Sequence, residues 1–70
     1  MNYIILFHTP VGVFCTKVKN DVEDTIQEKM NYYADPENFK EPISIETESS
    51  NIFISATILK QSVIEFNFHV

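Results

Sequence analysis

Two histidines and one cysteine are the residues of this 70-residue chain that could hold a soft metal ion or act as nucleophile and base. His8, Cys15 and His69 lack the close ligand pairs, a few residues apart, that zinc sites use. Cys15 falls in the middle of an expected strand and not at the start of a helix, where a thiol is activated by a lowered pKa. We therefore expect a buried packing cysteine, no metal site and no catalytic role for these residues.

Other combinations that carry chemistry are missing too. Gly12 is the only glycine and precedes an expected strand, so the chain has neither a phosphate-binding loop nor a dinucleotide fingerprint. Carboxylates abound, but Asp21 and Asp24 stand where a helix start favours negative charge, and Glu46 stands on the polar face of an expected strand. We expect a protein that is not an enzyme and carries no cofactor.

The charge balance narrows the choice of partners. Ten Asp and Glu residues oppose five cations, for a formal net charge of −5, and all five cations are lysines. Arginine, the best bidentate ligand for phosphate, is therefore missing. Nucleic-acid binding draws on many cations that release counterions, so we expect no direct contact with nucleic acid. An acidic surface instead attracts basic partners, or simply maintains solubility.

A group of acidic and aromatic residues forms the first candidate binding surface. It runs along an expected helix and into the loop that follows, and consists of Asp21, Asp24, Glu28, Tyr32 and Glu37. Such a face could mimic nucleic-acid phosphates and block a basic groove, with Tyr32 as an aromatic anchor. We expect an inhibitor that binds a host protein with a basic surface. The alternative is a solvated helix face without a partner.

Three lysines form the second candidate. Lys17, Lys19 and Lys60 could reach an anionic group in a pocket between the subunits of a homo-oligomer. The alternative function is therefore the sequestration of a small, nucleotide-like anion.

Composition also indicates the setting of the chain. A single cysteine cannot form an internal disulfide, which favours a reducing compartment. The apolar run over residues 3–7 is preceded by no cation and is far too short to span a membrane, so we expect a cytoplasmic chain without membrane contact. Much Ile, Asn, Lys and Phe is typical of AT-rich genomes, and small acidic chains are common in phages and other mobile elements. This association favours an inhibitor of that type.

The hydrophobic pattern predicts the elements that position these groups. Apolar and alternating runs predict strands over residues 2–7, 13–18, 43–48, 52–59 and 63–70. Apolar residues at helical spacing predict a helix over about 21–33, with Asn20 as its N-cap and Glu23 completing a capping box. Phe39 should anchor the following loop to the core. This order predicts a single α+β domain over residues 1–70, ββαβββ, in which one helix packs on a five-stranded antiparallel sheet that is open or curled toward a small barrel.

The small size of the chain also predicts self-association. Ordering costs about 1.5 kcal/mol per residue, which the core of so short a chain barely offsets. The last strand carries Phe66, Phe68 and Val70 without a protecting Pro or Lys, and such an edge pairs readily with another strand. We therefore expect a homo-oligomer.

Overall fold

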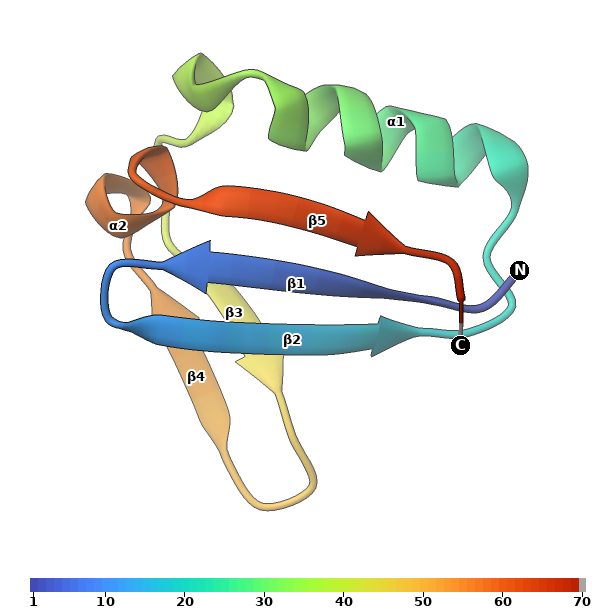
Figure 1. Ribbon diagram of the computed structural model, residues 1–70, viewed down its shortest axis with the longest axis horizontal. Coiled ribbons are helices and arrows are strands. Elements are labelled where there is room, and N and C mark those ends of the chain that lie inside the picture. Colours follow the sequence, from blue (N-terminus) through green and yellow to red (C-terminus); the bar gives the residue numbers. More distant parts are fainter. Residues whose placement is uncertain (70) are drawn as a thin grey trace.

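The computed structural model describes residues 1–69. Its elements are strands β1 (Tyr3–Thr9), β2 (Gly12–Val18), β3 (Ile43–Glu46), β4 (Asn51–Ile54) and β5 (Val63–Asn67), helices α1 (Glu23–Ala34) and α2 (Ala56–Lys60), and the 3-10 helix η1 (Pro36–Asn38). The α+β class is confirmed, with antiparallel sheets and two α-helices (Figure 1). The single five-stranded sheet is wrong, because the strands form a sheet of three in the order β2-β1-β5 and a separate pair β3-β4. The described strands therefore do not form the predicted barrel either.

The N-terminal hairpin follows the sequence prediction closely. β1 and β2 pair antiparallel from Tyr3 opposite Val18 to Thr9 opposite Gly12. Gly12 has a φ of 143°, a conformation that a residue with a Cβ rarely adopts, so the only glycine stands where the turn requires it. The Thr9 hydroxyl donates to the Gly12 carbonyl oxygen at 2.7 Å and accepts from the Val11 amide, which closes the turn.

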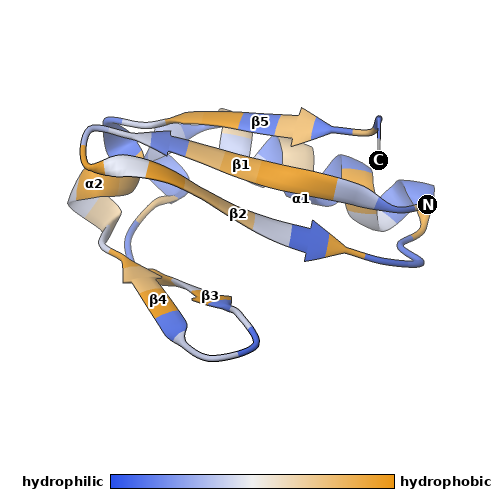
Figure 2. Ribbon diagram, turned by 60° about the horizontal axis from the view of Figure 1, so that its bottom comes forward, coloured by the Kyte–Doolittle hydropathy of each residue, from blue (hydrophilic) through white to orange (hydrophobic). Residues whose placement is uncertain are grey.

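The central strand β1 builds the core. Its alternate residues Tyr3, Ile5 and Phe7 are almost fully buried, between 1% and 4% exposed, on the face that α1 covers. From α1, Ile26 joins this core, and the Tyr33 ring meets Phe7 edge-on with a centroid distance of 5.7 Å. The unbroken apolar run of β1 predicts burial of both faces, but only one face is covered by another element (Figure 2).

The start of α1 differs from the predicted capping box. Asn20 lies in the left-handed region with a φ of 57°, and its side chain caps nothing. The N-cap is Val22, which offers no side-chain hydrogen bond, and the helix begins at Glu23. Asn20 instead uses its backbone amide, which donates to the Asn2 side-chain oxygen at 2.9 Å. The predicted helix is thus real, but begins two residues later than its charge pattern indicates.

The strand predicted over 52–59 is wrong in its second half. β4 ends at Ile54, and the chain turns at once into the short helix α2. Ser55 is the N-cap of α2, and its hydroxyl accepts a hydrogen bond from the Ile58 amide at 3.3 Å. This turn buries Leu59, which is only 1% exposed. Because the chain reverses at α2, the following strand β5 pairs with β1 and not with β4.

The β3-β4 hairpin closes the core on its remaining side. Its register places four isoleucines on one face, Ile43 opposite Ile54 and Ile45 opposite Ile52. Ile45 and Ile54 are buried in the common core, together with Phe39 at 2% exposed. The prediction that Phe39 anchors its loop is therefore confirmed.

The last predicted strand is shorter than the pattern indicates. β5 ends at Asn67, and Val70 lies outside the described residues. β5 is nevertheless an edge strand, paired with β1 on one side only. In the described part of the chain, no helix is long and apolar enough to cross a membrane.

Candidate functional site

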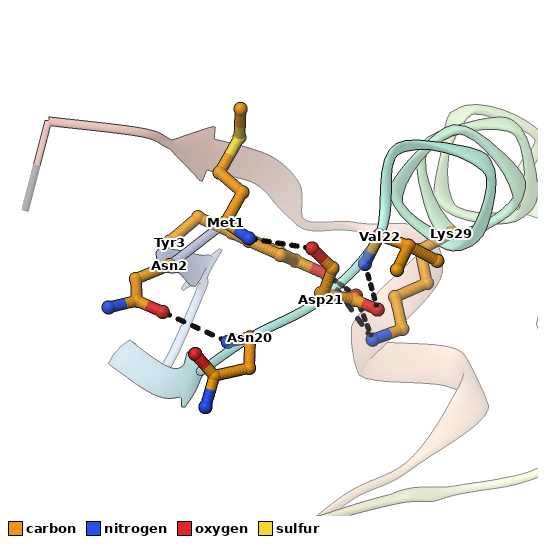
Figure 3. Close-up of polar contacts among 7 residues, drawn as sticks. All are labelled: Met1, Asn2, Tyr3, Asn20, Asp21, Val22 and Lys29. Atoms are coloured by element: carbon orange, nitrogen blue, oxygen red, sulfur yellow. Dashed lines mark hydrogen bonds and ion pairs between the residues drawn. The ribbon is translucent and has the colours of Figure 1, made fainter.

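Asp21 is the centre of a polar network that ties the start of α1 to the sheet (Figure 3). Its Oδ2 atom accepts hydrogen bonds from the Tyr3 hydroxyl at 2.7 Å and from the Lys29 ammonium at 2.8 Å. Lys29 also donates to the Tyr3 oxygen at 3.2 Å. The Asp21 backbone is held as well, because the Met1 amino group donates to its carbonyl oxygen at 2.7 Å.

These contacts shift the protonation equilibria of all three side chains. The hydrogen bonds from Lys29 and Tyr3 hold the pKa of Asp21 below its ordinary value. The hydrogen bond to the Asp21 carboxylate raises the pKa of Lys29. Burial, aided by the hydrogen bond to Asp21, raises the pKa of Tyr3. With its side chain only 12% exposed, Asp21 serves the fold and presents little negative charge to a partner.

Three other members of the predicted acidic surface lie along one exposed stripe of α1. Asp24, Glu28 and Tyr32 follow one another at intervals of four residues, which places them above one another on the same helix face. All three are exposed, Tyr32 to 42%. We call these residues the α1 stripe. Within residues 1–69, neither carboxylate of the stripe takes part in an ion pair, since the two pairs are Lys29–Asp21 and His8–Glu65.

The rest of the exposed helix face adds no positive charge. Lys29 is the only cation of α1, and it is turned toward Asp21. The Gln27 side-chain nitrogen donates to the Asn31 side-chain oxygen at 3.0 Å, so these two neighbouring side chains are neutral and bind each other. The α1 stripe therefore carries an uncompensated negative charge.

Tyr32 is fixed by the segment that follows the helix. Its hydroxyl donates to the Asn38 backbone carbonyl oxygen at 3.1 Å. The side-chain nitrogen of Asn38 donates back to the Tyr32 backbone carbonyl oxygen at 3.0 Å. Its ring packs against Tyr33 and Phe39, with centroids 5.2 and 5.9 Å away. Exposed Glu37 precedes Asn38 in η1, so this clamp places it beyond the aromatic end of the stripe.

The three lysines of the alternative site are not brought together. Lys17 and Lys19 line a common cavity at the end of β2. Lys60 ends α2, which lies at the opposite end of the three-stranded sheet (Figure 1). One binding site within a single chain can therefore use the first two lysines but not the third.

Cys15 differs most from its predicted environment. It is exposed, on the sheet face that points away from α1, so the prediction of a buried packing cysteine is wrong. On the same face, the imidazole of His8 lies 2.9 Å from the Glu65 carboxylate. His69 offers its backbone amide to the Asn67 side chain. Among the described residues, no three His, Cys, Asp or Glu side chains gather as a metal site would require.

Sequence reasoning missed the roles of Lys29 and Asn2. Lys29 stands beside the apolar stripe of the helix, and that position was the available sign that its side chain turns toward the sheet. Nothing in the sequence marks Asn2, which the fold places against Asn20 and in the cavity of the two lysines.

Comparison of the chain with known protein families, with curated protein sequences and with solved structures found no match. The roles of these residues therefore follow from their geometry, charge and exposure alone.

Proposed function

We propose that this chain is a small, acidic, non-enzymatic binding protein whose α1 stripe docks on a macromolecule with a basic surface. The partner class is a host protein, and the action is inhibition by occupying its basic groove, as for inhibitors of phage or mobile-element type. The observation that carries the proposal is the α1 stripe itself: two unpaired carboxylates and a half-exposed tyrosine in one line, while the only lysine of α1 is turned toward Asp21.

Charge supports fast and selective encounter. Complementary potentials raise association rates and discriminate against wrong partners more than they add affinity. Asp24 and Glu28 stand on one helix, so the positions of their Cα atoms are fixed before a partner binds. The net charge of −5 extends the attraction beyond the stripe, over a Debye length of about 8 Å at physiological salt.

Tyr32 supports affinity. Tyrosine is among the residues most enriched in the few positions that dominate binding energy. Its ring is already held by Tyr33, Phe39 and the Asn38 clamp, so the exposed part meets a partner without further ordering. We expect Tyr32→Ala to weaken binding by about 2 kcal/mol, the range of an interface hot spot.

The test is capture from a bacterial lysate on the immobilised chain, with elution by rising salt, followed by affinity measurement on the purified partner. The informative variant is Asp24→Asn combined with Glu28→Gln, because neutral isosteres preserve the shape of the stripe. The matched control is Glu46→Gln combined with Glu48→Gln, which removes the same charge from the β3-β4 hairpin. Circular dichroism verifies that both variants keep their helix content.

The proposal expects a basic protein that the wild type and the hairpin control retain and the stripe variant loses, with affinity reduced about tenfold. Equal affinity for the stripe variant and the control would contradict the assignment to α1. A partner without a basic surface, or binding that does not weaken with salt, would contradict the electrostatic basis of the proposal.

A further inference from the structure

The three-stranded sheet has one face that no other element within residues 1–69 covers. Residues of β2 and β1 that pair across the sheet point to the same side, so Lys17 opposite Ile4 and Cys15 opposite Leu6 share this face. Tyr3, Ile5 and Phe7 point the other way, toward α1. We call the uncovered side the open face. In Figure 2 the three strands of the sheet lie in front of α1, and β3 and β4 lie below them.

A cavity of about 250 Å³ lies at one end of the open face, where β1 begins and β2 ends. Its lining combines two cations, one amide and an apolar strip, and consists of Asn2, Tyr3, Ile4, Lys17, Val18 and Lys19. No carboxylate lines it. In a chain with twice as many acidic residues as cations, a cavity that gathers two lysines and excludes acids is a local reversal of charge.

The two lysines are placed to act on one anion. Lys17 is the next-to-last residue of β2 and Lys19 directly follows the strand, and both line the same cavity. Neither ammonium takes part in the ion pairs of residues 1–69, which are Lys29–Asp21 and His8–Glu65. Both charges are therefore available to a ligand.

Asn2 adds an amide to the lining of the same cavity. Its side-chain oxygen accepts from the Asn20 amide at 2.9 Å, which fixes the orientation of the group. The Asn2 nitrogen then lies on the side away from Asn20 (Figure 3) and has both of its N–H bonds to offer. Asn20 itself adopts a positive φ of 57° where the chain turns from β2 toward α1, so a strained turn holds the donor in place.

We infer that this cavity binds the phosphate group of a small phosphate monoester. Two ammonium groups match the charge of about −1.5 to −2 that a monoester carries at neutral pH, whereas a carboxylate would leave one of them unpaired. Ile4, which lies on the open face, offers apolar surface to the organic part of the ligand. The cavity volume of about 250 Å³ is far above what a single water molecule needs, so there is room for an anionic group.

This site is separate from the α1 stripe and does not depend on the proposed function. The stripe belongs to the helix under the sheet, and the lysines belong to the opposite face. Two carboxylates lie near this cavity, because Lys17 also borders a second cavity that Glu46 and Glu48 line. These carboxylates compete with a bound anion, so Glu46→Gln combined with Glu48→Gln should strengthen phosphate binding.

The test is a nuclear magnetic resonance titration of the full chain with inorganic phosphate and with ribose 5-phosphate, using ribose as the ligand without phosphate. The variant is Lys17→Gln combined with Lys19→Gln. Lys60→Gln is the control, because it removes a lysine charge at the other end of the sheet. Ionic strength is held constant, since exposed charges are sensitive to screening.

We expect saturable shifts of the amide signals of Asn2, Ile4 and residues 17–19 with both phosphates and none with ribose. The double variant should bind about tenfold more weakly, and the Lys60 control should bind as the wild type does. Shifts that are equally large around Lys40 and Lys60, or an affinity that the double variant leaves unchanged, would overturn the inference. The absence of saturation with either phosphate would overturn it as well.

Discussion

Phe39 and Phe53 form a matched pair that tests the packing of this fold. Phe39 is 2% exposed and lies in the common core beneath the loop after η1, against the rings of Tyr32 and Tyr33. Phe53 is 70% exposed, on the outer face of the β3-β4 hairpin. The same substitution, Phe to Ala, therefore removes the same atoms from two opposite environments.

The expected losses follow from burial. Phe39→Ala leaves a cavity in the core and should lower the free energy of unfolding by about 3–5 kcal/mol. Phe53→Ala removes atoms that already contact water and should change it by less than about 0.5 kcal/mol. A domain of this length has a total stability of about 3.5–10 kcal/mol, at about 0.05–0.15 kcal/mol per residue. The first substitution thus removes about a third of the stability or more, and the second almost none.

Urea denaturation followed by far-ultraviolet circular dichroism measures both values. With a slope of about 1 kcal/mol per molar urea, Phe39→Ala lowers the midpoint by about 3–5 M, whereas Phe53→Ala leaves it within about 0.5 M. If the alanine variant is unfolded in water, Phe39→Leu gives a milder loss of about 1 kcal/mol that can still be measured. Equal losses at the two positions would refute the assignment of inside and outside in the hairpin region.

Two further predictions concern pH and assembly. The lowered pKa of Asp21 means that its stabilisation is complete above the unfolded value of about 3.9 and is lost as the pH falls below it. The raised pKa of Lys29 means that its stabilisation is complete below the unfolded value of about 10.4 and is lost as the pH rises above it. The thermal unfolding temperature of the wild type should therefore fall at both acid and alkaline pH, and Asp21→Asn should lose the fall at acid pH. We also expect the chain to self-associate, since β5 is an edge strand and its first residue, Val63, is 68% exposed. Val63→Lys should then lower the sedimentation coefficient, and a monomeric wild type at high concentration would contradict this expectation.

The sequence was most informative where local pattern and turn chemistry agree. The apolar run of β1 and the single glycine predict the first hairpin, and Gly12 adopts the positive φ that its position demands. The helical spacing of Ile26, Met30 and Tyr33 predicts α1, and all three pack on the core. In each of these elements, one short segment contains the whole signal.

The segment after β4 shows why the remainder could not be predicted. Residues 52–59 contain three Ile, one Phe and one Thr, and such residues favour strands when they are considered alone. Ser55 is also a good N-cap, and the fold uses it to start α2 because this turn buries Leu59 in the core. The choice between strand and helix is made by that tertiary contact, which the local pattern does not contain.

The candidate sites show the same limit for charge. Asp21 and Asp24 lie three residues apart at the start of one helix, and sequence reasoning gives them the same role. The fold separates them, because Tyr3 and Lys29 converge on the first and leave the second in solvent. Which carboxylate is used internally depends on a strand 18 residues away, so it cannot be read from the helix sequence.

The same pairing decides how charge is distributed over the whole molecule. Because Lys29 forms an ion pair with Asp21, it does not compensate the negative charge on the exposed face of α1. Lys17 and Lys19 are left to the open face, on the other side of the sheet. The proposed basic partner and the inferred phosphate ligand are therefore assigned to opposite sides of the sheet, where neither blocks the other. The two surfaces share no residue, so substitutions in one should leave binding at the other unchanged.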